Sequence, residues 1–110
     1  MAGRISRGDI WLYDFKRPDK SRPVLVLTRQ EVIDFLNTVM VAPITSTMRG
    51  APGEVTVGVA EGLKHYSAVN LDHVQTVDQS RLSGFIGHLS NENMSEVCRA
   101  LAVAAGCPSS

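Results

Sequence analysis

The sequence predicts a mainly β domain, a compact antiparallel barrel with one helix at the C-terminus. Seven short segments rich in Val, Ile, Thr and aromatic residues show an apolar period of two, and clusters of Gly, Pro, Asn, Asp and Ser separate them. A single segment of clear helical period follows near the end of the chain. Parallel strands need long crossover connections, so this close spacing favours antiparallel pairing.

The expected elements follow one another at short intervals. A helix of two turns is expected over 30–37, after the second strand. The terminal helix has Ser90 as its N-cap and Glu92 in its first turn, and Gly106 followed by Pro108 ends it. Its apolar face should pack on the barrel. The expected strands are 9–15, 23–28, 38–45, 54–60, 67–71, 73–77 and 83–89.

Length and composition indicate one domain. The 110 residues, 44% of them hydrophobic, are enough for a single core, so we expect one domain over 1–110. The formal net charge is zero, but eight Lys or Arg stand against five Asp or Glu in residues 1–50, and three against six in residues 51–110. This asymmetry predicts a cationic face built from the N-terminal half.

Several classes of protein are excluded by what the chain lacks. No apolar run approaches the ~18 residues that span a bilayer, and the start has no signal-peptide core, so a cytoplasmic location is expected. Two cysteines are too few for a disulfide framework, and no Cys or His cluster has metal-ligand spacing. We therefore expect no metal and no other cofactor. Cys98 is interpreted as a core residue of the terminal helix, with no cationic partner.

A cationic loop leads directly into the second expected strand. The segment KRPDKSRP holds four cations in eight residues, and its last proline begins the strand VLVLT. Proline restricts the preceding Arg22 to extended backbone and suits the first position of a strand. Arg22 is either an ordinary surface arginine or a phosphate ligand, whose planar guanidinium matches phosphate oxygens. Lys16, Arg17 and Lys20 would give a phosphate there a field of the right sign.

Two further segments carry polar side chains at unusual places. Pro43 interrupts a strand pattern and precedes Thr45, Ser46 and Thr47, which indicates a strand edge or bulge of the kind that re-aims side chains near sites. Ordinary turn chemistry explains the hydroxyls equally well. Farther on, Asn70 and Asp72 are expected on one face of a strand, where aspartate is disfavoured.

The order of several motifs resembles the MazF/PemK family of bacterial toxin endoribonucleases. The resemblance runs from about Arg7 to the end of the terminal helix, so it covers practically the whole chain. Several motifs in one order are far more specific than any of them alone. The motifs are RGDIW (7–11), RPVLV (22–26), APITS (42–46) and QTVD (75–78) with Arg81 and Leu82.

The resemblance implies an SH3-like antiparallel β-barrel of the CcdB/PemK type with a C-terminal helix. It implies a homodimeric toxin of a type II toxin–antitoxin system that cleaves RNA at a short sequence without a metal, and so inhibits translation and growth. It also implies a cognate antitoxin whose flexible C-terminal segment lies over the RNA groove. The family's catalytic arginine and threonine fall on Arg22 and Thr45, and the aspartate that some members use as base falls on Asp72.

These positions fit RNA cleavage by the substrate's own 2′-hydroxyl. That reaction needs a proton acceptor, a proton donor for the leaving 5′-oxygen, and donors for the charge that grows on the phosphate. We expect Arg22 to clamp the phosphate, Thr45 to orient it by a hydrogen bond, and Asp72 to act as base. Because a 2′-hydroxyl is required, the substrate is RNA. The expected RNA contacts are Lys16, Arg17, Lys20, Ser46, Thr47, Asn70 and Gln75.

The chain departs from the family in the loop between its first two strands. KRPDKSR is short and lacks the Gly, Glu, Gln and His residues that members carry there, which leaves the general acid unassigned. Asn70 stands where members that use the aspartate have an arginine, and this weakens the transfer of Asp72. A short loop also predicts a groove open to structured tRNA or rRNA as well as mRNA.

Two other functions remain open at this point. Toxins of the same fold bind gyrase and cut nothing, and a small barrel also serves as a non-catalytic RNA-binding module. A gyrase binder has no need of an arginine and a threonine beside a cationic loop. A pure RNA binder typically shows stacking aromatic residues, and aromatics make up only 5% of this chain.

Overall fold

The segments of period two form a seven-stranded antiparallel sheet in the computed structural model, which describes residues 4–14 and 21–108. Each of the seven expected segments overlaps one strand of the structure. In the segment 54–60 the strand ends at Val57, and a 3₁₀ turn, η1 (Val59–Glu61), follows. The strands are β1 (Asp9–Asp14), β2 (Ser21–Val26), β3 (Thr38–Thr45), β4 (Glu54–Val57), β5 (Ser67–Asn70), β6 (Gln75–Asp78) and β7 (Leu82–His88).

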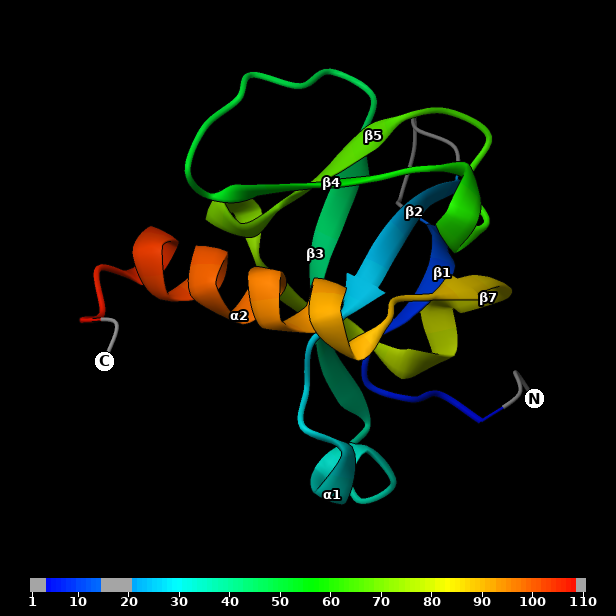
Figure 1. Ribbon diagram of the computed structural model, residues 1–110. Helices are drawn as coiled ribbons and strands as arrows, with labels where there is room; N and C mark the ends of the chain where they lie inside the picture. The colour runs from blue at the N-terminus through cyan, green and yellow to red at the C-terminus, as the bar shows by residue number, and fades with distance from the viewer. Residues whose placement is uncertain (1–3, 15–20, 109–110) are drawn as a thin grey trace.

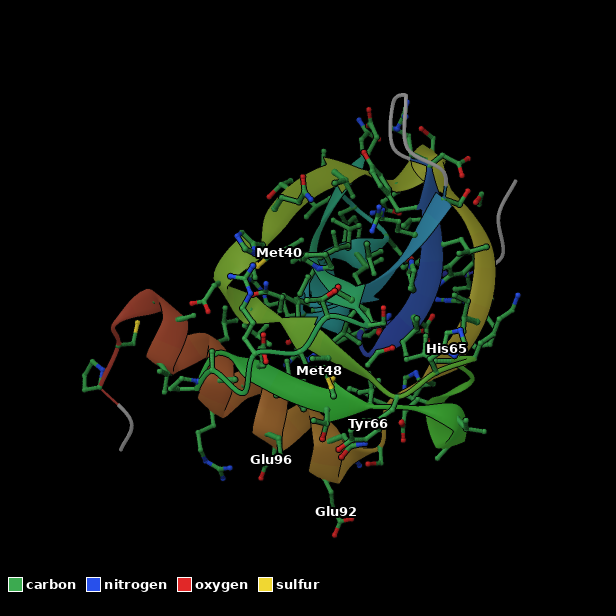
Figure 2. All side chains as sticks on the ribbon, turned by 90° about the horizontal axis from the view of Figure 1, so that it is seen from above. Met40, Met48, His65, Tyr66, Glu92 and Glu96 are labelled. Carbon is green, nitrogen blue, oxygen red and sulfur yellow. The ribbon has the colours of Figure 1, made fainter. Side chains whose placement is uncertain are left out.

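The sheet curls around its own core without closing. Its strand order is β4-β5-β3-β2-β1-β7, and β6 lies beside β3 off this path. Figure 1 shows β4 and β5 at one end of the molecule, and Figure 2 shows the strands curving around a central core. In the part of the chain that the structure describes, β4 and β7 do not pair. The predicted mainly β fold with a C-terminal helix is confirmed, but "barrel" describes it only loosely.

Strand β2 is buried on both faces, which explains its unbroken apolar run. Val24 and Val26 pack in one core cluster with Trp11 and Val41, whereas Leu25 packs in the other. Alternate residues of a strand point to opposite faces of the sheet, so a strand between two apolar layers needs apolar residues at every position. This central position makes β2 a rigid support for the side chains of its first residues, Ser21 and Arg22.

The terminal helix begins and ends where the sequence predicts. Helix α2 (Asn91–Ala105) starts after Ser90, whose Oγ accepts a hydrogen bond from the Asn93 N–H at 3.1 Å, and it ends at Gly106, which has a φ of 73°. Val97 lies in the core cluster beside β4, and α2 crosses the end of the sheet in Figure 1. No helix within 4–14 and 21–108 is long and apolar enough to cross a membrane.

The helix expected over 30–37 is shorter than predicted. Helix α1 covers only Gln30–Ile33. The carbonyl oxygens of Ile33, Leu36 and Thr38 instead accept hydrogen bonds from Nε2 of Gln79, at 2.9, 2.9 and 3.0 Å. Of these three carbonyl groups, only that of Ile33 would have been engaged by a second helical turn, because the last four carbonyl groups of a helix have no partner within it.

Pro43 lies in a central strand, so the predicted sheet edge is wrong. It stands opposite Val24 of β2. On the other side of β3, the pairing with β6 ends at Val41 and the pairing with β5 begins at Ile44. Pro43 occupies the interval between these two partners, where its missing N–H removes no ladder bond on that side. The proline thus marks a break in pairing inside the sheet.

The strand expected through 67–71 ends at Asn70, so the prediction that Asn70 and Asp72 share a strand face is wrong. Residues Leu71–His73 form a 3₁₀ turn, η2, and Oδ1 of Asn70 accepts a hydrogen bond from the Asp72 N–H at 3.0 Å. This is an Asx turn, for which Asn is well suited. An aspartate that would be disfavoured in mid-strand is therefore accommodated in a turn.

Candidate functional site

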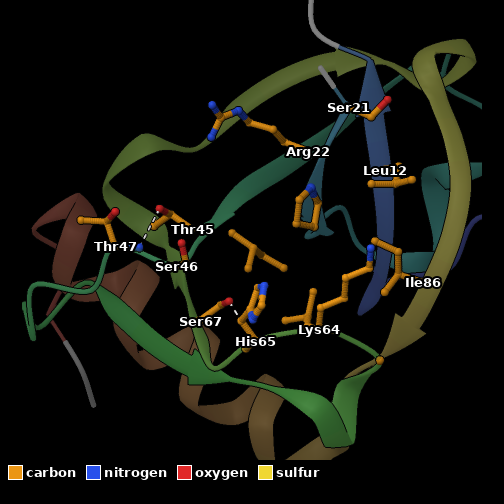
Figure 3. Close-up of a pocket in the computed structure, with 14 residues that line it drawn as sticks. Leu12, Ser21, Arg22, Thr45, Ser46, Thr47, Lys64, His65, Ser67 and Ile86 are labelled. Atoms are coloured by element: carbon orange, nitrogen blue, oxygen red, sulfur yellow. Dashed lines mark hydrogen bonds between the residues drawn. The ribbon is translucent and has the colours of Figure 1, made fainter. Parts of the chain in front are cut away.

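A groove of about 560 Å³ opens between the start of β2, the end of β3 and the segment that leads into β5. Figure 3 shows these three parts of the chain around its opening. Leu12 of β1 and Ile86 of β7 form an apolar wall. The remaining lining comes from residues 21–23, 44–47, 62–65 and 67.

The structure brings Arg22 and Thr45 to the same groove, as the sequence predicts. Val24 of β2 lies opposite Pro43 of β3, and continuing this antiparallel register by two residues places Arg22 opposite Thr45. Both residues stand where their strands leave the core, Arg22 just before Pro23 and Thr45 just after the buried Ile44. The sheet therefore places a cation and a hydroxyl on facing strands.

The hydroxyl groups after β3 also belong to the groove. Ser46 and Thr47 line it beside Thr45. Oγ1 of Thr45 accepts a hydrogen bond from the Thr47 N–H at 3.1 Å, drawn as a dashed line in Figure 3. Because a hydroxyl that accepts one bond keeps its own proton to donate, Thr45 can still donate to a ligand oxygen.

Asp72, Asn70 and Gln75 do not line this groove. The carboxylate of Asp72 lies over Gly53, where an added Cβ would be 2.6 Å from its Oδ2. Asn70 is engaged locally, because its Nδ2 is 2.7 Å from Nδ1 of His73. Gln75 begins β6 and pairs with Val41. These three predicted residues are therefore grouped around η2 and β6, apart from Arg22 and Thr45.

The predicted loop cations lie outside the described residues. Lys16, Arg17 and Lys20 belong to 15–20, between β1 and β2. The positive charge that the structure does place at the groove comes from Arg22 and Lys64, and no Asp or Glu of the described chain lines it. This charge balance suits an anionic ligand.

The segment that precedes β5 supplies lining residues that are not among the predicted site residues. Lys64, His65 and Ser67 all line the groove, with His65 exposed and Ser67 buried. Neither spacing nor period singles out these residues, because they face Arg22 only after β5 pairs with β3 through Val69 and Ile44. The one local signal is a pair of adjacent basic side chains, Lys64 and His65, one residue before the strand begins.

Two glycines hold this segment against β7. Gly62 has a φ of 96°, a left-handed conformation that favours glycine. An added Cβ at Gly87 would lie 2.0 Å from the backbone oxygen of Glu61, and one at Gly62 would lie 2.5 Å from that of Ile86. Such close backbone contact leaves no room for a side chain. It fixes one wall of the groove.

The carboxylate of Asp14 in β1 accepts hydrogen bonds from side chains at the start of β2 and in β7. Ser21 and Ser83 donate hydrogen bonds to Oδ1 of Asp14 at 2.5 and 3.1 Å. These bonds, with the nearby charge of Arg81, hold the pKa of Asp14 below its ordinary value of 3.8. Since the folded-state pKa is the lower one, the bonds contribute to stability at neutral pH and are lost as the pH falls through it.

Cys98 does not lie where the sequence analysis expects it. Cys98 is exposed, and Nη2 of Arg7 lies 3.2 Å from its Sγ, so the prediction of a core cysteine without a cationic partner is wrong. The packing of the N-terminal segment on α2 creates this contact. Within the described residues, no group of three or more His, Cys, Asp or Glu side chains has an arrangement that could hold a metal ion.

Known proteins match the chain over nearly its full length. The model of the family described as PemK-like, MazF-like toxin of type II toxin-antitoxin system matches residues 6–105. The Mycobacterium tuberculosis protein named "Probable endoribonuclease MazF5" is 37% identical over 108 residues, which are 97% of this chain and 98% of that protein.

Solved structures agree with this match. The Mycobacterium tuberculosis toxin MazF-mt6 has a TM-score of 0.85 and 37% identity, covering 92% of this chain and 99% of that one. A MazE-MazF crystal structure from Deinococcus radiodurans has a TM-score of 0.77 and 25% identity, covering 93% and 96%. Since the family model spans most of the chain, the chain belongs to the PemK-like, MazF-like family of toxins of type II toxin-antitoxin systems.

Proposed function

We infer that this chain is an endoribonuclease toxin that cleaves RNA and thereby inhibits translation and growth. Its family consists of toxins of type II systems, and its relatives from Mycobacterium tuberculosis are named endoribonucleases. The observation that carries the inference is the placing of Arg22 and Thr45 on facing strands at one cationic groove. A toxin that only bound gyrase would have no need of this pair.

We assign the charge-stabilising part of the reaction to Arg22 and Thr45. The guanidinium of Arg22 donates hydrogen bonds to the oxygens of the scissile phosphate, whose negative charge grows as the 2′-oxygen attacks. The hydroxyl of Thr45 donates to the same phosphate from the facing strand and fixes its orientation. Arginine remains protonated, so Arg22 takes no part in proton transfer.

The assignments outside the groove stay hypotheses. Asp72 as base and Asn70 and Gln75 as RNA contacts require the RNA to extend from the groove toward η2 and β6, since that is where these residues lie. Lys16, Arg17 and Lys20, which precede β2 in the sequence and lie outside the described residues, would attract the polyanion. Whether mRNA alone or also tRNA and rRNA is cut depends on how far structured RNA enters the groove.

Cleavage should not require a metal ion. Among the described residues, those that line the groove include Arg22, Lys64 and several hydroxyl groups but no carboxylates for a hard divalent cation. Purified protein incubated with total RNA and excess EDTA should produce discrete new 5′ ends, which sequencing of the ends would map. If EDTA abolished the cuts and Mg²⁺ or Mn²⁺ restored them, the proposed mechanism would be wrong.

We further propose that the toxin is a homodimer. Large apolar side chains remain exposed on several elements, including Phe35 at 85%, Phe85 at 58% and Val103 at 51%. A second copy of the chain would cover part of this surface. Sedimentation equilibrium at micromolar concentration should give twice the mass of 11.9 kDa. A monomer under those conditions would contradict the proposal.

The cognate partner proposed for this toxin is an antitoxin whose flexible C-terminal segment covers the groove. A structure from Deinococcus radiodurans that is similar to this chain is a MazE-MazF crystal structure. Both partners would act in the cytoplasm, where translated RNA is found. Adding the antitoxin should block cleavage, and an antitoxin that bound tightly but left cleavage unchanged would place its segment elsewhere.

A further inference from the structure

His65 lines the groove and has no part in the assignments above. His65 lies in the segment between η1 and β5, is exposed, and lines the groove together with Lys64 and Ser67. In Figure 3 its ring rises toward the middle of the groove from the side that faces Arg22. A side chain in this position would meet the same ligand that Arg22 and Thr45 hold.

The charged and titratable groups that line the groove leave few options for proton transfer. Among the described residues they are Arg22 from β2, and Lys64 and His65 from the segment before β5. Arginine does not release its proton, and lysine is ordinarily protonated near neutral pH. Imidazole exchanges a proton in that pH range and is a frequent general base. His65 is therefore the lining side chain best suited to accept a proton.

The backbone that carries His65 is held in place. Oγ of the buried Ser67 donates a hydrogen bond to the backbone oxygen of His65 at 3.0 Å. The N–H groups of Gly62 and Leu63 donate to the oxygens of Val59 and Gly58 at 3.0 and 3.2 Å. A side chain that transfers a proton accelerates a reaction only when it is kept within hydrogen-bond distance of the reacting atom. These bonds fix the backbone from which the His65 side chain extends.

We propose that His65 is the general base of the RNA cleavage, an inference that rests on the proposed endoribonuclease function. A ring nitrogen of neutral His65 takes the proton of the 2′-hydroxyl, and the 2′-oxygen attacks the adjacent phosphorus. The P–O5′ bond then breaks, the leaving 5′-oxygen takes a proton from water, and the hydroxide that remains takes the proton back from the imidazolium. The products are a 2′,3′-cyclic phosphate and a 5′-hydroxyl, and His65 is neutral again. The imidazolium that forms for a time lies beside the same phosphate to which Arg22 donates hydrogen bonds.

This assignment replaces Asp72 as base on geometric grounds. The carboxylate of Asp72 lies over Gly53 beside η2, and Asp72 does not line the groove that holds Arg22 and Thr45. His65 does line it. A base must come within about 2.6–3.2 Å of the proton it takes, directly or through one water molecule. An RNA held in the groove shares it with His65, whereas contact with Asp72 requires the RNA to extend toward η2.

The test uses the full-length protein and a short RNA that contains one mapped cleavage site. Single-turnover rates are measured from about pH 5 to pH 9 with saturating enzyme and EDTA. His65→Gln should lower the rate about 10²- to 10⁴-fold and remove the rise in rate through the range where imidazoles lose their proton. Binding of a 2′-O-methylated copy of the RNA should stay unchanged. Added imidazole should partly restore cleavage by His65→Ala.

His73→Gln is the matched control. His73 is also exposed and belongs to η2, and it does not line the groove, so its replacement should leave the rate and its pH profile as in the wild type. Thermal unfolding of each variant, with the rescue by imidazole, separates a lost base from a misfolded protein. Asp72→Asn is measured in parallel to decide between the two candidate bases.

The outcomes separate the two levels of inference. If the wild type cuts no RNA under any condition, the proposed function fails. If the wild type cuts and folded His65→Gln cuts at a similar rate with the same pH profile, only the assignment of His65 fails. It fails equally if Asp72→Asn removes the acid limb while His65→Gln keeps it, or if His65→Gln weakens binding by the same factor as it slows cleavage.

Discussion

Replacing Arg22 by Lys should slow RNA cleavage about 10²- to 10³-fold while RNA affinity changes little. Lysine keeps the positive charge but presents a point charge on a flexible stem, whereas arginine presents a planar fork that matches two phosphate oxygens. Pro23 restricts the backbone of Arg22, and the buried strand that follows fixes the point from which its side chain starts. Arg22→Ala should lose affinity as well as rate. Single-turnover rates and binding of a 2′-O-methylated RNA measure the two effects separately.

Arg29 and Arg49 provide matched controls for this experiment. Both are exposed and neither lines the groove, because Arg29 precedes α1 and Arg49 lies in the loop before β4. Their replacement by Ala removes the same charge from the chain and should affect turnover hardly at all. Near-wild-type cleavage by folded Arg22→Ala protein would remove Arg22 from the site.

Replacing Thr45 by Val should cost about 2.7–4 kcal/mol of transition-state stabilisation, which is about a hundredfold or more in rate. The change removes the hydroxyl and keeps a similar volume at the end of β3. It also removes the acceptor of the Thr47 N–H, but Thr47 is exposed and water can take that bond. The expected loss is therefore in turnover rather than in folding, and rates combined with thermal unfolding measure both.

Thr45→Ser is the control that separates the two roles of this side chain. Serine retains the hydroxyl that donates to the phosphate and the oxygen that accepts from Thr47, so it should keep most of the activity. If Thr45→Val cleaved RNA as fast as the wild type, the hydroxyl would have no role in the reaction. If Thr45→Ser were as slow as Thr45→Val, shape rather than hydrogen bonding would explain the loss.

Local rules in the sequence accounted for most of the secondary structure. An alternating apolar pattern depends on which face of a strand is buried, and each of the seven segments became a strand. Ser90 and Gly106 act on backbone groups within a few residues of themselves, which is why both ends of α2 were predictable. The prediction of a longer helix over 30–37 was wrong. Helix α1 ends at Ile33, whose carbonyl oxygen accepts a hydrogen bond from Gln79, more than forty residues away.

The candidate site was predictable only in part. Pro23 acts on the residue next to it, and the family motifs around Arg22 and Thr45 are contiguous in sequence, so both residues could be named without a structure. Asp72 could not be placed, because whether Asn70 continues a strand or forms an Asx turn depends on a single side-chain hydrogen bond. Cys98 was misread because Arg7 approaches it from the far end of the chain.

The sequence by itself determined the class of fold, the family, and four residues that line the groove, which are Arg22, Thr45, Ser46 and Thr47. Only the tertiary structure decided that Arg22 and Thr45 stand on facing strands, that His65 and Lys64 close the opposite side, and that Asp72 lies elsewhere. The physical reason is the range of the interactions. Period, caps and proline act over a few residues, whereas strand register and the backbone contact between Gly87 and Glu61 join segments more than twenty residues apart.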